Sequence, residues 1–254
     1  MLENCDFPKL PTRYDVALRG AVSFVLASFT PVGIIASGTI LRGNPDATSD
    51  IDLWVVHLEP MRQRLQRFFN AVPVEIFVNP PWAIQTYFAQ DQSSARPISA
   101  HMMATGHVIL ATDPIVSELR RKAKWLLTQP PDLSEEAITQ AKYAAATRFE
   151  DGTDIAIRNP IGASMMLSQS LVEMIRFAFM QARRFVPRDK DLLEEFGLFD
   201  NESAAKVRAF FQTSDCQERV TLATEVADRI LGTRGFFEWT SVPEMKEKPS
   251  DRAT

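Results

Sequence analysis

Three carboxylates form the group of residues in this sequence that is best suited to chemistry. Asp50 and Asp52 stand one residue apart at the start of the apolar run Ile51–Val56, and Glu75 interrupts a later apolar run. Ionised carboxylates are costly to bring together unless a cation joins them. Because Mg²⁺ and Mn²⁺ prefer carboxylate oxygens, all three residues are candidate metal ligands.

Carboxylates arranged around one or two divalent ions can support phosphoryl or nucleotidyl transfer. The ions neutralise a polyphosphate and hold the attacking and leaving oxygens, and Glu75 is also a candidate general base for a hydroxyl. Simpler interpretations stay open, since an Asp-x-Asp pair can be a plain loop pair and a strand Glu often faces solvent. A calcium loop is not indicated, because Leu53 and Trp54 follow the pair where further oxygen ligands would be needed.

A glycine turn precedes the carboxylates. The apolar run Ile34–Ala36 leads into Ser37, Gly38 and Thr39, and Arg42 follows closely. Glycine lets a backbone approach a phosphate, and the Thr39 hydroxyl with the N–H groups of a following helix can hold phosphate oxygens. Arg42 can add charge-assisted contacts. An ordinary strand-to-helix turn with a capping threonine would look the same.

The elements that must position these residues follow from the hydrophobic pattern. Apolar spacing predicts a helix over residues 12–29. Short apolar runs predict strands over residues 32–36, 51–56, 74–78 and 107–111. Alternate strand residues share a face, so Asp50 and Asp52 point away from the core side of Leu53, and Glu75 can join them if the two strands are neighbours.

A further helix is expected between the second and third strands. Pro60 suits a first helical position, and the apolar residues that follow fit one helical face. These residues are Met61, Leu65, Phe68 and Phe69.

The character of the chain changes after Asp113. Asp113-Pro114 and Asn159-Pro160 are typical of helix starts, and residues 114–232 show helical periodicity without a convincing strand. The expected fold is α+β, with a small mixed β-sheet and flanking helices followed by an all-α helical bundle. The expected domains are a catalytic domain over 1–112, a helical domain over 113–241 and a loose tail over 242–254.

Composition narrows the functional classes. The 254 residues carry a net charge of −4, which argues against stable nucleic-acid binding because there is no basic excess to neutralise phosphates. The local basic run Arg120–Lys124 is typical of a solvated helix face. The two cysteines, Cys5 and Cys216, do not form a zinc-ligand pattern. No signal peptide or membrane span is indicated, so we expect a cytoplasmic protein.

The constellation resembles the nucleotidyltransferase superfamily typified by DNA polymerase beta, and most closely its aminoglycoside nucleotidyltransferase branch. That family's pattern is a Gly-Ser turn, a spacer, an Asp-x-Asp pair and a third acid on a later strand. Gly38-Thr39, Asp50-Ile51-Asp52 and Glu75 follow it, and Ser49 precedes the first aspartate as in the family. Thr39 keeps the hydroxyl of the usual serine, and glutamate occurs in the antibiotic-modifying branch at the place of Glu75.

The resemblance implies an enzyme that moves a nucleoside monophosphate from ATP or another nucleoside triphosphate to a hydroxyl of a small-molecule acceptor, such as an aminoglycoside-like compound. It implies a polymerase beta-like core joined to a helical bundle, with Mg²⁺ or Mn²⁺ on the carboxylates and pyrophosphate as product. Gly38, Thr39, Arg42 and Ser49 would bind the nucleotide. Lys190, in the segment RRFVPRDKDLLEEF, would reach its phosphates, although by pattern alone it is a surface residue.

Two other functions fit parts of the same pattern. A nucleotide-sensing or antitoxin-like protein could keep the fold without turnover. A glycosyltransferase can use Asp-x-Asp for a sugar nucleotide, but only 49 residues precede Asp50, and Gly38-Thr39 and Glu75 would be unexplained. The acceptor, the preferred nucleotide and the oligomeric state are not fixed by the sequence.

Overall fold

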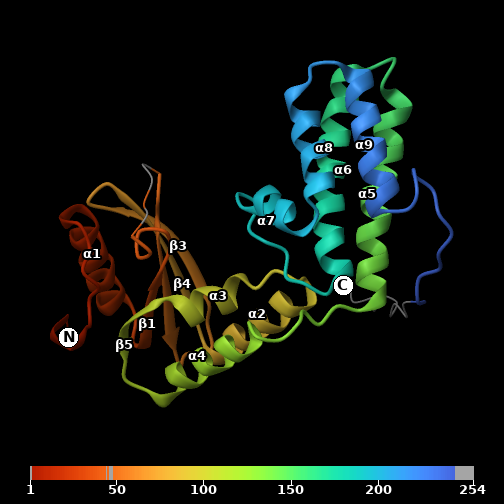
Figure 1. Cartoon of the computed structure of the whole chain (residues 1–254). Coiled ribbons are helices and arrows are strands. Elements are labelled where there is room, and N and C mark those ends of the chain that lie inside the picture. The colour runs from red at the N-terminus through yellow and green to blue at the C-terminus, as the bar shows by residue number, and fades with distance from the viewer. Residues whose placement is uncertain (1, 44, 46–47, 244–254) are drawn as a thin grey trace, which may run out of the picture. The chain divides into compact units, whose positions relative to one another are not determined.

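The computed structural model describes residues 2–43, 45 and 48–243. The chain divides into two compact units, Met1–Asp132 and Leu133–Thr254. The first combines a β-sheet with helices and the second is helical, which confirms the expected α+β class (Figure 1). Of the expected tail, residues 244–254 lie outside the described part.

The sheet of the first unit has five strands in the order β3-β4-β2-β1-β5. These strands are β1 (Pro31–Ser37), β2 (Ile51–His57), β3 (Gln63–Phe69), β4 (Val72–Asn79) and β5 (His107–Ala111). β2 and β4 run parallel, whereas the other neighbouring pairs are antiparallel. The sheet is therefore mixed, and the expected strands over 32–36, 51–56, 74–78 and 107–111 are confirmed.

Helices cover both faces of this sheet (Figure 1). A short 3-10 turn, η1 (Leu2–Asn4), precedes α1 (Thr12–Ser28), which packs on the face that carries Ile51, Leu53 and Val55. The other face packs against three helices: α2 (Pro81–Ser93), α3 (Ile98–Thr105) and α4 (Pro114–Leu126). The burial of β4 alternates as expected, with Val74, Ile76 and Val78 buried and Glu75 only half-buried.

The helix expected after Pro60 is wrong, because residues 63–69 form β3 and pair with β4 in a hairpin. Asn70 and Ala71 connect the strands with φ angles of 47° and 55°, the left-handed conformations of a tight hairpin turn. Leu65 and Phe69 are four residues apart, a spacing that places both on one face of a helix or of a strand. Phe68, 78% exposed, faces the opposite side.

The division between the units falls after Asp132 rather than at the expected boundary after residue 112. The reason is α4, which begins at Pro114 with Asp113 as its N-cap, as the sequence indicated, but belongs to the first unit. Its buried residues Val116 and Leu119 pack in the same core cluster as Trp54 of the sheet. Periodicity marks this segment as a helix but does not say which core it joins.

The second unit contains five helices in its described residues. They are α5 (Glu135–Ile155), α6 (Pro160–Gln181), α7 (Leu192–Phe199), α8 (Asn201–Gln212) and α9 (Cys216–Ile230). α6 packs along α5, where the buried Ser170 Oγ donates a hydrogen bond to the Ala145 carbonyl at 2.8 Å. Arg148 and Glu173 form an ion pair between the same two helices at 3.0 Å.

Two further expectations concern the membrane and the cysteines. Among the helices of the described chain, none is both long and apolar enough to cross a membrane. In the described part of the chain, Cys5 and Cys216 are not joined by a disulfide.

Candidate active site

A row of polar side chains crosses four strands of the sheet at the end where β2 begins. Ser37 on β1 pairs with Asp52 on β2, Asp52 pairs with Glu75 on β4, and Glu75 pairs with Gln66 on β3. Directly paired residues on one face lie within reach of each other. The parallel pairing of β2 with β4 thus places Asp52 beside Glu75, the arrangement that the sequence required but could not establish.

The turn after β1 brings the backbone against the aspartates. Gly38 has a φ of +113°, and a Cβ added there would lie 3.0 Å from the Asp50 carbonyl oxygen and 3.7 Å from Asp52 Oδ2. A side chain at position 38 would therefore be strained and crowded. The hydroxyls of Thr39 and Ser49 hydrogen-bond each other, with their oxygens 2.9 Å apart, and this contact ties the two ends of the intervening loop together.

No helix follows this turn in the described residues, which corrects the expectation that helical N–H groups would surround a phosphate. Instead, the Arg42 N–H donates to the Thr39 carbonyl at 3.2 Å, and the Gly43 N–H donates to the Ile40 carbonyl at 3.2 Å. These contacts make one isolated turn. The Arg42 side chain is exposed near the carboxylates, where its charge acts on Asp52.

The surroundings of Asp52 disfavour the ionised form of its carboxyl group. Burial, together with the negative charges of Asp50 and Glu75, raises the pKa of Asp52 to about 6, against the opposing charges of Arg64 and Arg42. Buried like charges favour the neutral form of a carboxyl, and a cation between them would favour the ionised form. Asp50 and Asp52 therefore fit a hard divalent cation.

Glu75 is engaged by side chains of β3. Arg64 Nη2 donates to Glu75 Oε2 at 2.7 Å, and Gln66 donates to the other carboxylate oxygen. In the described residues, no three or more His, Cys, Asp and Glu side chains gather as a metal site. The two aspartates fit the ion, whereas Glu75 would have to leave Arg64 and Gln66 to become a third ligand. Its role as a ligand stays a prediction.

An aromatic row lies next to the polar row on the same face. Trp54 stacks on Phe77 with ring centroids 5.6 Å apart and meets the edge of Tyr87 at 6.1 Å. The Arg64 guanidinium lies 5.0 Å from the centre of the Phe77 ring. Trp54 is only 4% exposed, and a buried apolar ring beside a carboxylate lowers the local dielectric constant, which strengthens the electrostatic interactions of Asp52.

Three residues of the site were missed from the sequence. Ser37 is only 5% exposed, and among the described residues its hydroxyl has no hydrogen-bond partner, although it lies in the row beside Asp52. Arg64 and Gln66 were assigned to a helix. Alternation within residues 63–69 could have found them, because in a strand both must share one face, opposite Leu65.

The remaining predicted residue is in the second unit. Lys190 is exposed in the turn before α7, not within a helix. Its predicted contact with nucleotide phosphates stays a prediction. His57 and His107 each use the ring Nε2 in a hydrogen bond with a backbone carbonyl, that of Met61 at 2.8 Å and that of Asp6 at 2.9 Å.

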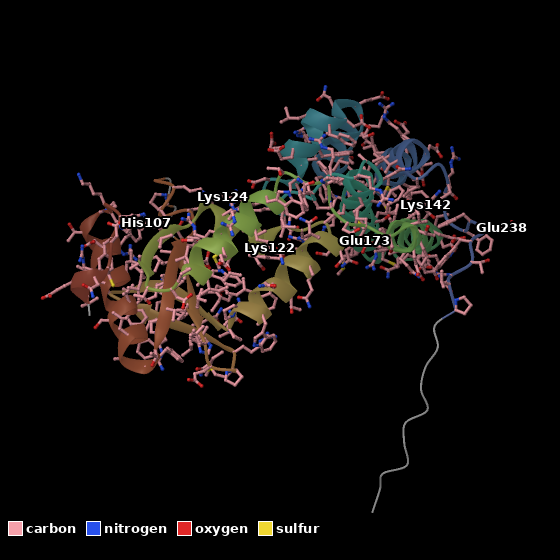
Figure 2. All side chains as sticks on the ribbon, turned by 90° about the horizontal axis from the view of Figure 1, so that it is seen from below. His107, Lys122, Lys124, Lys142, Glu173 and Glu238 are labelled. Carbon is pink, nitrogen blue, oxygen red and sulfur yellow. The ribbon has the colours of Figure 1, made fainter. Side chains whose placement is uncertain are left out.

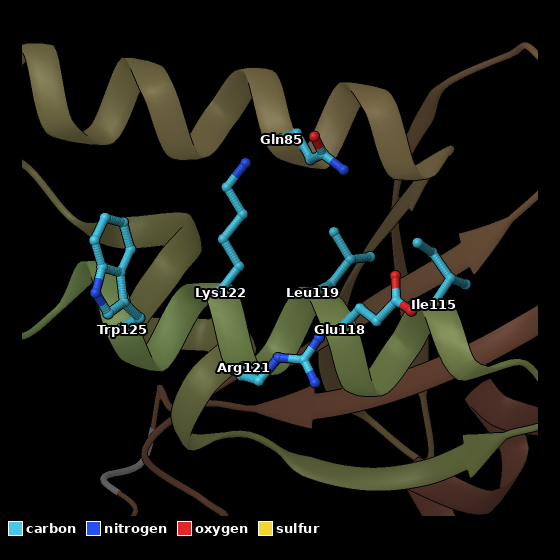
Figure 3. Close-up of a pocket in the computed structure, with 7 residues that line it drawn as sticks. All are labelled: Gln85, Ile115, Glu118, Leu119, Arg121, Lys122 and Trp125. Atoms are coloured by element: carbon cyan, nitrogen blue, oxygen red, sulfur yellow. The ribbon is translucent and has the colours of Figure 1, made fainter.

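A separate cavity of about 440 Å³ lies between α2 and α4. Gln85, Leu119, Lys122 and Trp125 are among its lining residues, and Figure 3 shows Lys122 extending from α4 towards α2. Lys122 and Lys124 of α4 (Figure 2) are exposed, but Arg120 of the same basic run is half-buried and donates to the carbonyls of Met103 and Ala104, so the run is not wholly a solvated face. None of the predicted site residues lines this cavity.

Comparison with known proteins finds a similarity to solved structures. No protein-family model matches the chain, and no curated protein matches it. The structure is similar to the crystal structure of a nucleotidyltransferase-like protein from Exiguobacterium sibiricum, with a TM-score of 0.54. The fold is nucleotidyltransferase-like. The match covers 85% of this chain and 73% of the other at 16% sequence identity, so the likeness concerns the fold.

Proposed function

We propose that this chain is a Mg²⁺-dependent nucleotidyltransferase that moves AMP from ATP to a hydroxyl of a small-molecule acceptor. The observation that carries the proposal is the pairing of Asp52 with Glu75 across two parallel strands, with the backbone of Gly38 against Asp50. A cation at two aspartates, a close backbone approach and a nearby carboxylate are the parts that phosphoryl-group chemistry needs. The nucleotidyltransferase-like fold supports the same proposal.

The nucleotide phosphates would lie over the turn between β1 and β2. Gly38 has no side chain that would obstruct them. If Ser49 donates the hydrogen bond between the two hydroxyls, the Thr39 hydroxyl can donate its own hydrogen to a phosphate oxygen. Arg42 is exposed beside the turn and can contact a phosphate with its charged N–H groups. Asp50 and Asp52 would hold Mg²⁺, which when bound would neutralise the phosphates and polarise the α-phosphorus. Lys190 would be a second positively charged side chain, besides Arg42, that contacts the phosphates.

The chain's own residues would also handle the proton of the reaction. The acceptor oxygen would form a bond to the α-phosphorus while the bond from that phosphorus to the bridging oxygen breaks and pyrophosphate leaves. Glu75 would take the proton of the attacking hydroxyl. Trp54 and Phe77 cover the sheet beside these carboxylates, so water is excluded from that side during the transfer.

For the acceptor we propose a hydroxylated small molecule, and a cationic, aminoglycoside-like compound is the first to test. The helical unit carries acidic residues on α5, namely Glu150, Asp151 and Asp154, of which Asp151 and Asp154 are exposed. Carboxylates on a surface raise the local concentration of a cationic ligand. A neutral hydroxylated acceptor in the same panel would show whether this charge matters.

The test is pyrophosphate release from the full chain with Mg²⁺, each nucleoside triphosphate and an acceptor panel. We expect release with ATP and at least one acceptor, and its loss in Asp50→Asn, because the amide cannot supply the anionic oxygen that the ion needs. Full activity of Asp50→Asn would overturn the assignment. The matched control is Asp132→Asn, a change of the same type at an exposed position far from the β2 carboxylates in sequence.

A nucleotide-binding protein without turnover is the second candidate. It is favoured by one observation, the engagement of both Glu75 oxygens by Arg64 and Gln66, which leaves the candidate base occupied. ATP binding without pyrophosphate release for any acceptor would support this candidate. Release of pyrophosphate that depends on Asp50 would exclude it.

A further inference from the structure

The edge strand β3 supplies two side chains that hold the carboxylate of Glu75. Gln66 is the direct cross-strand partner of Glu75, and Arg64, two residues earlier, pairs with Phe77 on the same face. Arg64 Nη2 donates to Oε2 at 2.7 Å, while Gln66 donates to Oε1. Both carboxylate oxygens are thus held from the β3 side, whereas Asp52 stands on the opposite side, on β2.

The position of Arg64 is itself fixed by a second contact. Its guanidinium lies 5.0 Å from the centre of the Phe77 ring, and this ring stacks on Trp54 in the buried layer under the helices. A guanidinium that stacks on a ring and pairs with a carboxylate has less freedom than one in an ion pair alone. Glu75, with a side chain only 19% exposed, is therefore held by a partner that is itself anchored.

Arg64 would compete with a bound divalent ion for the carboxylate of Glu75. Asp50, Asp52 and Glu75 are three acids, and Arg64 and Arg42 are the cations whose charges act on Asp52. A divalent ion at the two aspartates would attract the Glu75 carboxylate as well. Arg64 and Gln66 oppose that movement, because Glu75 would have to give up both hydrogen bonds to reach the ion.

We propose that Arg64 is a positioning residue that keeps Glu75 out of the coordination of the ion at Asp50 and Asp52 and reserves it for the acceptor hydroxyl. This inference rests on the proposed function and decides between the two roles open to Glu75. Without Arg64, the carboxylate turns to the ion. Metal binding then becomes tighter while the transfer becomes slower, because the base is occupied by the metal.

The decisive measurement is the affinity of the full chain for Mn²⁺ alone, followed by the electron paramagnetic resonance signal of free Mn²⁺. We expect Arg64→Ala to bind Mn²⁺ about tenfold more tightly, which corresponds to one unit of log affinity. Loss of a nearby positive charge would also tighten binding without any movement of Glu75. A double-mutant cycle with Glu75→Gln separates the two effects.

In the cycle, Glu75→Gln should weaken Mn²⁺ binding little in the unaltered chain and about tenfold in the Arg64→Ala background, because only there does Glu75 reach the ion. The matched control is Arg67→Ala on the same strand. The Arg67 guanidinium lies 4.5 Å from the Phe24 ring of α1, on the other face, and its loss should leave Mn²⁺ affinity unchanged. An additive cycle, or unchanged affinity in Arg64→Ala, would overturn the role of Arg64.

Pyrophosphate release by the unaltered chain is measured in parallel, so that two failures can be told apart. Release together with an additive cycle overturns the positioning role and leaves the proposed function standing. A non-additive cycle without release for any acceptor supports the position of Glu75 relative to the ion and overturns the proposed transfer. Thermal unfolding of each variant checks the fold, and Arg64, with a side chain 62% exposed, should contribute little to it.

Discussion

The two faces of the β-sheet differ in what their side chains are used for. The face under α1 is apolar along the central strands, where Ile51, Leu53 and Val55 pack against Val74 and its neighbours on β4. The face towards α2, α3 and α4 begins with a polar row and continues with a buried aromatic row. Alternate residues of the same strands thus serve stability on one side and candidate chemistry on the other.

The comparison shows that stability and candidate function are separated by a single step in the sequence. Asp52 and Leu53 are neighbours on β2, but one is an acid with a raised pKa and the other is fully buried hydrocarbon. Because strand side chains alternate, a change at one position leaves the opposite face in place. We therefore expect substitution of Asp52 to lower activity without lowering stability, and substitution of Leu53 to lower stability without changing metal affinity.

The largest effect is expected for Asp52→Ala on the polar side. Loss of one of the two aspartates that would hold the ion should lower pyrophosphate release by about a thousandfold. The chain should be no less stable to heat, because the substitution removes a half-buried carboxylate that is repelled by its neighbours. The measurements are pyrophosphate release and thermal unfolding. A variant that kept its activity would contradict the separation of the two faces.

The second effect is expected for Leu53→Ala on the apolar side. Leu53 is fully buried under α1, and truncation of such a side chain costs about 2–5 kcal/mol of unfolding free energy. Urea unfolding followed by tryptophan fluorescence measures the loss. Under conditions where the variant is folded, its Mn²⁺ affinity should equal that of the unaltered chain. Weaker Mn²⁺ binding by the folded variant would show that the two faces are coupled.

Asp91 provides a sharper test, because it is a buried carboxylate in the helical layer on the polar side of the sheet but outside the polar row. Its side chain accepts a hydrogen bond from the Ala100 N–H at 2.8 Å and so caps α3, whose own N-cap Pro97 has no side-chain acceptor. Burial raises the pKa of Asp91 to about 6, against the lowering effect of hydrogen bonds from Ala100 and Ser99.

A folded pKa above the unfolded value means that folding favours the protonated group. The stability that this protonation contributes is complete below about pH 4 and is lost as the pH rises through about 6. In Asp91→Asn the amide oxygen still caps α3 and does not titrate, so the decrease between these pH values should become smaller. Urea unfolding at pH 4 and pH 7 measures it. An unchanged pH dependence would contradict a buried, titrating Asp91.

The smallest effect is expected for Ser37→Ala. The Ser37 hydroxyl is buried and has no hydrogen-bond partner in the part of the chain that the structure describes, so its removal should leave unfolding free energy unchanged or raise it by less than about 1 kcal/mol. If the hydroxyl serves the bound phosphates, the KM for ATP should increase while stability does not fall. Thermal unfolding and pyrophosphate release at varied ATP concentrations test the two parts. A marked loss of stability would show that Ser37 has a structural role.

Particular residues show how far the sequence could predict the fold and the site. Apolar runs located β1, β2, β4 and β5, and the spacing of Asp50, Asp52 and Glu75 located the candidate carboxylates. The strand β3 was missed because Leu65 and Phe69 fit both periods and because its turn, Asn70-Ala71, lacks the glycine that usually marks a hairpin. With β3, the sequence prediction also lost the partners of Glu75.

The sequence by itself determined which residues alternate along each strand. It therefore placed the side chains of Asp52 and Glu75 on one face of the sheet and those of Leu53 and Ile76 on the other face. It also determined the glycine turn before the carboxylates. Only the tertiary structure decided that β2 lies parallel to β4 with Asp52 beside Glu75, and that β3 brings Arg64 to the same carboxylate. Local alternation follows from backbone geometry within one strand, whereas pairing depends on how distant segments bury their apolar faces together.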